Sequence, residues 1–370
     1  MNQVSVVMVG DVRFNRSLAD DPVAAIGRLS AEFRRELEAD VLLANLECSL
    51  GSPVPRVGAK NDVPLATCPP SSALALKALG VNVVTMANNH IFDGGAQGLD
   101  LTRKVLDEAG IAYFGAGLNY EEAAKPWIVE RNGVRIGFLG FCGCECAGRN
   151  KPGTLLLDYG ASYRLMRKVK DDCDYLVIYF HEGIEATNYP TRMAMRACHR
   201  AVDCGADLVV GTHPHTVQGI ERYKGVPIVY SLGNFIMPLL DPLEYGWWQP
   251  QTALARMGIG FDRKLIARAL ILRCVFRRGE RVRVEPVPIL VEESGLPRLP
   301  AGDEVAEEAA FLEELCEAFH RPDSPVWRVR DEVERGYARL GRSDISWTYV
   351  LRNLHRTRPH HVVSFLRTFR

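Results

Sequence analysis

Two histidines with one residue between them follow an apolar run near residue 210. The run Leu208-Val209-Val210 leads into Gly211-Thr212-His213-Pro214-His215. Neutral imidazole is the commonest metal ligand among side chains, and a proline restricts the turn that presents the two rings. A buried strand that ends here places both imidazoles at its carboxyl end, which is where open α/β sheets bind ligands. The motif alone is weak evidence, because paired histidines in a loop are more often ordinary surface residues.

Carboxylate, amide and imidazole groups recur at the same position after other apolar runs. Residues 4–10 lead into Asp11, and residues 41–44 lead into Asn45 and Glu47. Asp11 taken alone is an equally good turn cap. The potential ligands or acid–base groups that come just after a predicted strand are Asp11, Glu47, Asn89, His90, His181, His213 and His215. Because strand carboxyl ends meet at one edge of a sheet, we expect these side chains to form one shared metal site.

The elements that must position these groups alternate along the chain. Apolar runs predict strands at residues 4–10, 41–44, 81–86, 175–180, 207–210 and 226–231. Amphipathic spacing predicts helices at residues 23–38, 71–79, 98–109 and 191–204, and helices again from about residue 303. Turn residues predict two hairpins, residues 127–130 with 134–141 and residues 265–276 with 282–291. The alternation of strands and helices predicts an α/β fold.

Composition narrows the class of protein. The 370 residues allow one large domain or two. Lys+Arg and Asp+Glu both number 45, so no charge excess indicates nucleic acid as a partner. The first residues carry no signal-peptide pattern, and no stretch approaches the roughly 20 apolar residues of a membrane span. We therefore expect a cytoplasmic protein without membrane contact.

The cysteines and two other segments leave alternatives open. Cys142, Cys144 and Cys146 form a cluster, but their spacing is not the Cys-x-x-Cys of zinc or redox sites. Residues 241–251 form a loop rich in aromatic residues that either covers a substrate or packs on the sheet edge. Residues 352–370 are basic, which indicates either a solvated helix face or a surface for an acidic peptide.

Together the motifs resemble the CapA family of capsule-synthesis proteins, a branch of the calcineurin-like metallophosphatase superfamily. The resemblance covers about residues 3–290. It rests on Gly10-Asp11-Val12, Asn45-Leu46-Glu47, Ala87-Asn88-Asn89-His90 with Asp93 and Gly95, His181-Glu182-Gly183, Gly211-Thr212-His213-Pro214-His215 and Ser231-Leu232-Gly233-Asn234-Phe235. It implies a four-layer α/β/β/α sandwich with the metal at the strand ends. We expect this catalytic domain to span residues 1–298, with residues 299–370 as a helical extension packed on it.

The resemblance also implies roles for single residues. Asp11 matches the family's first metal-ligand aspartate, and Glu47 takes the place of the bridging carboxylate. Asn89 matches the ligand asparagine, and His90 matches the neighbouring acid–base histidine. The remaining ligand histidines correspond to His181, His213 and His215.

Position 13 departs from the pattern of the two-metal phosphatases. Those enzymes have Asp-x-His at the first motif, whereas Asp11 is followed two residues later by Arg13. One half of the metal site therefore lacks a ligand, which argues against a two-metal clamp on a phosphoryl group.

Capsule-forming members are typically tethered by an amino-terminal membrane segment, which this sequence does not show. It is more similar to soluble members, in particular to CapA-like epimerases that convert the carboxyl-terminal tryptophan of a lasso-peptide precursor to its D form.

We therefore predict a metal-dependent peptide epimerase whose partner is a ribosomal precursor peptide. The donor set suits Mn, Zn, Fe or Ca in one or two sites, and no organic cofactor is expected. Asp11 and His90 are the predicted acid–base groups for the two faces of Cα. The residues predicted to bind substrate are Asn45, Arg13, Trp247 and Trp248.

Two other interpretations use the same residues. The first is a metal-dependent hydrolase of a γ-glutamyl amide or a phosphoester, in which His90 protonates the leaving group. The second is a binding protein with a vestigial metal site, against which the intact ligand positions argue.

Overall fold

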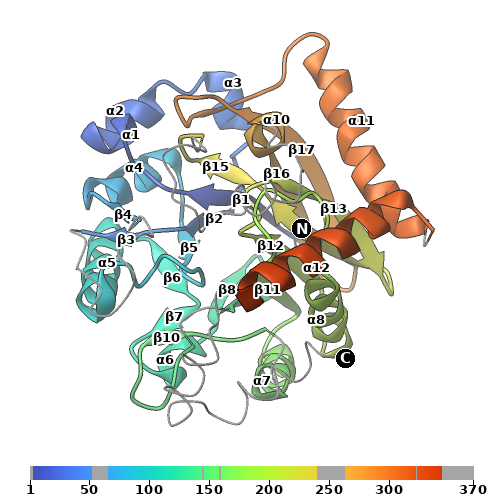
Figure 1. The fold of residues 1–370 in the computed structure, drawn as a ribbon. Helices are drawn as coiled ribbons and strands as arrows, with labels where there is room; N and C mark the ends of the chain where they lie inside the picture. Colours follow the sequence, from blue (N-terminus) through green and yellow to red (C-terminus); the bar gives the residue numbers. More distant parts are fainter. Residues whose placement is uncertain are drawn as a thin grey trace.

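Two large β-sheets stack face to face at the centre of the protein (Figure 1). The computed structural model describes residues 3–51, 66–143, 146–157, 160–239, 263–321 and 323–343. The first sheet has the order β18 (Pro297–Arg298), β17 (Arg283–Val291), β16 (Arg268–Arg277), β1 (Gln3–Val12), β2 (Val41–Leu46), β5 (Val83–Thr85) and β6 (Ala112–Phe114), and β15 (Asn234–Ile236) also pairs with β1. The second has the order β13 (Val217–Tyr223), β14 (Val226–Leu232), β12 (Leu208–Thr212), β11 (Tyr175–His181), β9 (Val134–Cys142) and β8 (Trp127–Arg131).

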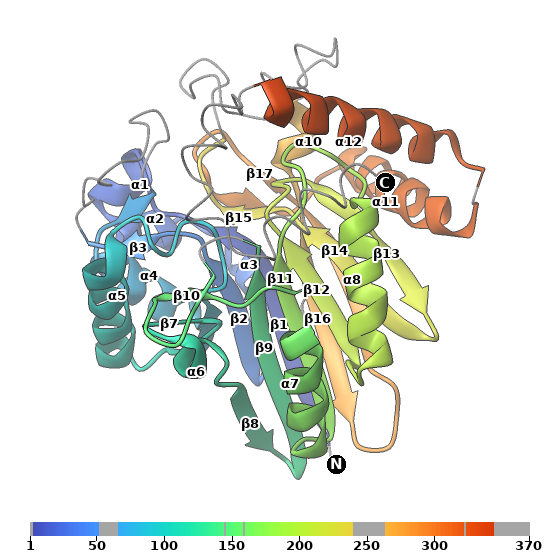
Figure 2. The ribbon, with the colours of Figure 1, turned by 60° about the horizontal axis from the view of Figure 1, so that its bottom comes forward.

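Helices cover the outer faces of both sheets (Figure 2). Those beside the first sheet are α1 (Ser17–Asp20), α2 (Pro22–Gly27), α3 (Ala31–Arg35), α4 (Ser71–Leu79) and α5 (Gly95–Ala109). Those beside the second are α7 (Gly160–Asp171) and α8 (Arg192–Asp203), with the short α6 (Tyr120–Ala123) nearby. Two small ribbons pair β3 (Ser49–Leu50) with β4 (Thr67–Cys68) and β7 (Ala116–Gly117) with β10 (Gly153–Thr154).

Alternating side chains of the central strands divide the core into layers. In β11, Val177 and Tyr179 face the other sheet, whereas Ile178 and Phe180 pack under the outer helices. In β1, Met8 faces the second sheet and Val9 the outer helices. Strands buried on both faces read as continuous apolar runs, which is why the sequence revealed them. The predicted four-layer α/β/β/α sandwich is confirmed.

Two predicted elements begin or end elsewhere. The helix predicted over residues 23–38 is broken into α2 and α3, because the Ser30 side chain accepts a hydrogen bond from Phe33 N and starts a new helix. The strand predicted from residue 265 begins only at Arg268, after the short helix α10 (Arg263–Ala267). Asp11 and His181 are among the last residues of their strands and do not follow them.

Several elements were missed by sequence reasoning, among them β13 and α7. β13 alternates only partly, since its second half is polar and half-exposed at the sheet edge. α7 buries few side chains, among them Met166 and Val169, and is otherwise charged. Because each element contains few apolar residues, neither shows a clear hydrophobic periodicity.

The described part of the carboxyl-terminal region packs against β13 and β16. It consists of α11 (Glu304–Glu317), the short helix η1 (Ala318–His320) and α12 (Pro325–Ser343). Arg268 Nε donates to Glu308 Oε2 at 2.7 Å in a buried pair, and its guanidinium lies 3.9 Å from the Phe311 ring centre. The boundary after residue 298 stays a prediction. No helix within the described ranges is long and apolar enough to cross a bilayer.

A glycine allows α11 to approach β13 closely. A Cβ added to Gly219 would lie 2.5 Å from Leu315 O and 2.8 Å from the Phe319 ring. We predict that Gly219→Ala lowers the free energy of unfolding by about 1–3 kcal/mol, because the strand and helix must separate. Urea denaturation measures this change.

The matched control is Gly27→Ala, where an added Cβ meets no atom within 4 Å at a helix end. Equal stability of the two variants would show that α11 is not seated on β13 as described.

Candidate metal centre

The carboxyl ends of strands from both sheets meet around Asp11 and Glu47. Asp11 N donates to Gly233 O at 3.1 Å, and Glu47 N donates to Val12 O at 3.0 Å. The backbone of β1 is thereby fixed between β2 and β15, which pair with it in parallel. Both carboxylates are fully buried. The edge of the sheets therefore holds two carboxylates at a place that excludes water.

The loop after β12 delivers His213 and His215 through a strained backbone. Their φ angles are 98° and 57°, in the left-handed region that non-glycine residues seldom adopt. Ala186, with φ 55°, donates from its N to Pro214 O at 2.7 Å and holds the loop after β11 against it. Strain of this kind persists where the surrounding structure enforces it and is common at functional sites.

Glu47 is a buried carboxylate whose oxygens accept no hydrogen bond from a described residue. Its Oε1 lies 3.6 Å from His181 Nε2 and 3.6 Å from His215 Nε2. Arg13 Nη2 lies 3.4 Å from the same oxygen. A buried charge without hydrogen bonds is costly, and a cation between these groups would remove that cost.

Two sets of ligand atoms converge on Glu47. Ligand atoms of Glu47, His181 and His213 lie within 4.8 Å of one another, as do those of Asp11, Glu47 and His215. Asn89 Oδ1 lies 2.9 Å from His181 Nε2, so the amide belongs with the first set. Carboxylate, amide and imidazole donors suit a divalent transition ion. The residues present therefore fit a metal, with Glu47 common to both halves of the site.

Arg13 lies beside the carboxylate that the two sets of ligand atoms share. Arg13 is buried, and its Nε donates to Glu47 O at 3.3 Å in addition to the ion pair with Oε1. This places a permanent positive charge beside Glu47. The site thus combines the ligand atoms with a fixed cation of the protein itself.

Amide and hydroxyl groups hold the ligands in place. Asn45 Nδ2 donates to Asp11 Oδ1 at 2.6 Å, and Asn88 Nδ2 donates to Asn45 Oδ1 at 3.1 Å. Thr212 Oγ1 lies 3.0 Å from His181 Nδ1, and Asn234 Oδ1 lies 2.8 Å from His215 Nδ1. Such partners orient metal ligands. Asn45 holds Asp11 in the structure, and its predicted contact with substrate stays a prediction.

His90 forms a buried pair with Asp93 beside the metal ligands. Its Nδ1 lies 2.6 Å from Asp93 Oδ2, which also accepts a hydrogen bond from Ala66 N at 2.7 Å. Burial and the nearby Arg13 lower the pKa of His90 to about 4. A neutral imidazole whose Nδ1–H is held by a carboxylate presents a free Nε2, which is the arrangement of a general base.

Glu185 is a functional candidate that sequence reasoning missed. Its carboxylate acts electrostatically on Glu47, His90, His213 and His215. It lies in the loop after β11, next to the strained Ala186. The only available signal was its place four residues after His181, because no motif argument singled it out.

The structure thus brings together all the predicted ligands, with Arg13, Asn45 and His90. Trp247 and Trp248, predicted to bind substrate, lie outside the described residues, as does the basic stretch 352–370. Cys142 is buried at the end of β9, and Cys144 of the same cluster is outside the described ranges.

Proton affinities in the cluster differ strongly between neighbours. Burial raises the pKa of Glu47 to about 8, against the opposing charge of His215. Burial also opposes the charge on His215, but Glu47 and Asp11 outweigh it and raise its pKa to about 10. The pKa values of His181 and His213 are lowered, chiefly by burial. Neutral His181 and His213 are ready to bind a metal, since a ligand imidazole must be deprotonated.

Fold and site together define a metal-binding α/β/β/α sandwich with its donors at the strand ends. Residues 5–239 match the model of the family described as bacterial capsule synthesis protein PGA_cap. The chain belongs to this family. The predicted resemblance to CapA proteins is thereby confirmed.

Characterised relatives match the chain over shorter segments. It is similar to a capsule biosynthesis protein CapA of Bacillus anthracis, 36% identical over 181 residues, covering 47% of this chain and 43% of the relative. It is also similar to a PGA biosynthesis protein CapA of Bacillus subtilis, 34% identical over 181 residues, covering 48% of this chain and 46% of the relative. The chain thus spans less than half the length of these curated relatives.

Solved structures with a related shape are more distant in sequence. A phosphatase from Mycoplasma pneumoniae is 17% identical with a TM-score of 0.49, covering 78% of this chain and 94% of that one. A hypothetical protein from Thermus thermophilus is 18% identical with a TM-score of 0.46, covering 77% of this chain and 98% of that one.

Glu47→Gln separates metal binding from stability. The amide keeps the shape but removes the charge shared by the two sets of ligands. We predict at least about 100-fold weaker metal binding, more than the loss of an outer partner causes. The metal-free variant should be as stable as the parent or more so, because a buried amide costs less than a buried charge.

Metal titration calorimetry and urea denaturation of the metal-free proteins measure the two quantities. The control is Glu130→Gln, an exposed carboxylate of β8 whose loss should change neither. Parallel loss of stability and affinity in Glu47→Gln would identify Glu47 as a structural residue instead.

The metal-free protein should lose stability between pH 7 and pH 8. Glu47 and His215 have pKa values of about 8 and about 10, above their ordinary values of 4.5 and 6.5. In this window the folded state binds more protons than the unfolded state, so the free energy of unfolding falls as the pH rises. The slope is at most about 1.4 kcal/mol per pH unit for each group.

Urea denaturation of chelator-treated protein at the two pH values measures this slope, and Glu47→Gln should reduce it. Metal affinity should change the other way and increase with pH, because the ligands must be deprotonated. A free energy of unfolding that rises over this window would contradict the assignment.

Proposed function

We propose that this member of the family is a metal-dependent peptide epimerase that exchanges the Cα proton of a carboxyl-terminal residue, with tryptophan as the expected residue. The observation that carries the proposal is Arg13, whose Nη2 lies 3.4 Å from Oε1 of Glu47, the carboxylate common to both sets of ligand atoms. Guanidinium groups bind carboxylates in two-pronged pairs, and the terminal carboxylate of a peptide is such a partner. A phosphoryl clamp would need a second metal ion in this place.

A divalent ion held by Glu47, His181 and His213 with Asn89 would supply positive charge that stabilises developing negative charge on the substrate carboxylate. The residues of the chain would bind, orient and exchange the proton. Arg13 would hold the carboxylate next to Glu47. His90 Nε2, with Nδ1 fixed by Asp93, would accept the Cα proton.

A second acid–base group must return a proton from the opposite face. Asp11 is our candidate, with His215 Nδ1 3.4 Å from its Oδ2 as the proton source. Its oxygens already accept hydrogen bonds from Asn45 Nδ2 and His213 N, so one of these contacts must yield when Asp11 takes up a proton. Glu185 is the competing candidate, because its carboxylate is half-buried and close enough to influence His90.

Hydrolysis of an amide such as a γ-glutamyl bond is the second candidate. Family membership and the names of the relatives, which include a PGA biosynthesis protein, support this reaction more directly than they support epimerisation. The same residues would serve, with His90 protonating the leaving amine. Arg13 then binds a carboxylate beside the cleaved bond.

Mass spectrometry in D2O distinguishes the two reactions. The metal-loaded protein is incubated with peptides that end in tryptophan, with any precursor peptide encoded beside its gene, and with oligo-γ-glutamate. We expect one non-exchangeable deuterium at the terminal residue of an uncut peptide. His90→Gln should slow uptake by about 10²–10⁴-fold with unchanged metal content. Cleaved products without deuterium at Cα would show that the protein hydrolyses the peptide and does not epimerise it.

Variants at the second acid–base position complete the test. Asp11→Asn and Glu185→Gln are compared for uptake starting from the L and the D peptide. Loss of uptake from one enantiomer before the other assigns the face on which the residue acts, whereas full activity of Asp11→Asn would remove Asp11 from the mechanism.

Arg13→His tests the role of the guanidinium. The change supplies the imidazole that two-metal sites have at this position, so we predict that the metal content rises by about one ion per chain. The Michaelis constant for a peptide with a free terminal carboxylate should rise, whereas an amidated peptide should show little difference between parent and variant. Elemental analysis and steady-state kinetics measure both. Unchanged metal content and kinetics would mean that Arg13 serves neither purpose.

A further inference from the structure

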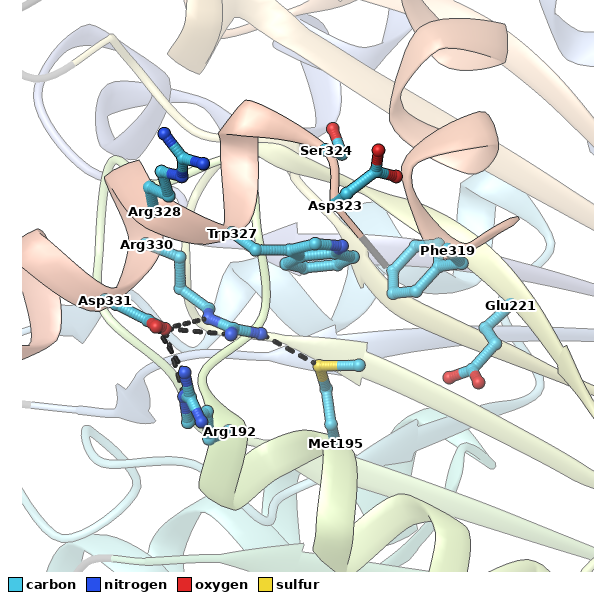
Figure 3. Close-up of a pocket in the computed structure, with 10 residues that line it drawn as sticks. All are labelled: Arg192, Met195, Glu221, Phe319, Asp323, Ser324, Trp327, Arg328, Arg330 and Asp331. Atoms are coloured by element: carbon cyan, nitrogen blue, oxygen red, sulfur yellow. Dashed lines mark hydrogen bonds and ion pairs between the residues drawn. The ribbon is translucent and has the colours of Figure 1, made fainter. Parts of the chain in front are cut away.

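A cleft lies apart from the metal ligands (Figure 3). It is found where α12 crosses the amino end of α8 and the edge strand β13 (Figure 1). Its volume is about 550 Å³. It is lined by side chains of α8, β13, η1 and α12, and none of them belongs to the metal site. The cleft is therefore a separate feature of the surface.

The centre of the cleft is aromatic. The Trp327 ring lies 5.4 Å from the Phe319 ring and 6.0 Å from Tyr189, measured between ring centres. Phe319 stacks in turn on the buried Tyr230 at 5.2 Å. Trp327 Nε1 donates to Arg321 O at 3.1 Å, so its polar atom is satisfied within the protein. Tryptophan is enriched among the anchor residues of binding surfaces.

Cations gather at one end of the cleft. Arg330 lies over the Trp327 ring, 4.6 Å from its centre, and donates to Asp331 Oδ1 at 2.8 Å. Arg192 Nε donates to the same Asp331 oxygen at 3.0 Å, and its side chain is 59% exposed. Arg328 is exposed and also lines the cleft. Asp331 thus pairs with two guanidinium groups, whereas the Arg328 side chain points away from it (Figure 3).

The acidic groups at the other end differ in accessibility. Glu221 is already the acceptor of His199 Nε2, at 2.8 Å, and of Tyr230 Oη, at 2.6 Å. Asp323 is exposed on the opposite wall from the Arg192–Asp331 pair (Figure 3). A ligand that spans the cleft therefore meets accessible positive charge next to an aromatic floor. Its matching chemistry is a carboxylate adjacent to an aromatic or apolar side chain.

The same elements support the loop that follows the metal ligand His181. Arg192 N donates to Glu334 Oε1 at 2.7 Å, and Ile184 packs against Val333 of α12. The wall of the cleft is thus continuous, through the loop 184–191, with the rim of the metal centre.

We propose that this Trp327 cleft is a second binding site, which holds an upstream segment of the peptide substrate through an aromatic side chain with a neighbouring Asp or Glu. The proposal rests on the proposed action on peptides but not on the reaction carried out at the metal. It assigns specificity to residues that the chemistry does not use.

Binding of blocked peptides tests the site separately from the metal centre. The probe is acetyl-Gly-Asp-Phe-Asp-Gly-amide with a fluorescent label, which has no terminal carboxylate for the metal centre. We expect saturable binding to the full chain, and weaker binding of peptides with Asn or Lys in place of Asp. Fluorescence anisotropy measures the affinity, and the variant Glu47→Gln should bind the probe as the parent does.

Two variants of the cleft should weaken binding of the probe. Trp327→Ala removes the aromatic floor, and the double variant Arg192→Gln with Arg328→Gln removes exposed charge and keeps the core intact. Each should weaken binding by about tenfold, in line with the loss of an anchor or of charged hydrogen bonds. Val329→Ala is the matched control, because Val329 is 52% exposed on the same helix and does not line the cleft.

Kinetics with a full-length substrate give an independent readout. The cleft variants should raise the Michaelis constant and leave kcat unchanged, as expected when uniform binding is lost. The site is refuted if the probe shows no saturable binding, if the Lys peptide binds better, or if Val329→Ala weakens binding as much as Trp327→Ala does. Failure of deuterium uptake would refute the epimerase and leave the result for the probe untouched.

Discussion

A buried carboxyl group, whose charged form needs a cation beside it, organises this protein. Glu47 lies at the junction of the two sheets without a hydrogen bond from any described residue, and Arg13, His181 and His215 approach one of its oxygens. Such a charge is tolerated only where cations or a metal compensate it. The contacts around it follow from this need. Asn45 holds Asp11 near the end of β1, and Asn88 binds the last residue of β2 through Leu46 O. The loop with His213 and His215 adopts backbone angles that would otherwise be avoided.

The parts of the fold and site that could be predicted share one physical origin. Strands such as β11, buried on both faces, and single polar residues at their ends leave a pattern along the sequence, so Asp11, Glu47 and His181 were found. Asp93 and Asn234 were noted only as parts of motifs. Their roles depend on contacts to His90 and His215 that form between distant segments, and no spacing rule encodes these contacts. Glu185 was missed for the same reason.

Arg13 and the Trp327 cleft illustrate how a family fold acquires its own specificity. The strands and ligands set up the metal centre, whereas Arg13 adds a positive charge beside the shared Glu47. The cleft lies between helices that follow the last strand of the first sheet and the elements α8 and β13 of the sandwich. Chemistry and recognition thus depend on different segments, so that one can vary while the other is preserved.

The position of β1 imposes an order on assembly. It carries Asp11 and precedes the other ligands along the chain, yet it pairs with β15 and β16, which follow all of them. A growing chain therefore offers the donors on separate segments, and they converge only after most of the chain has left the ribosome. Contacts between such distant segments form late in folding. A complete set of metal ligands therefore exists only once β1 has paired with its late partners.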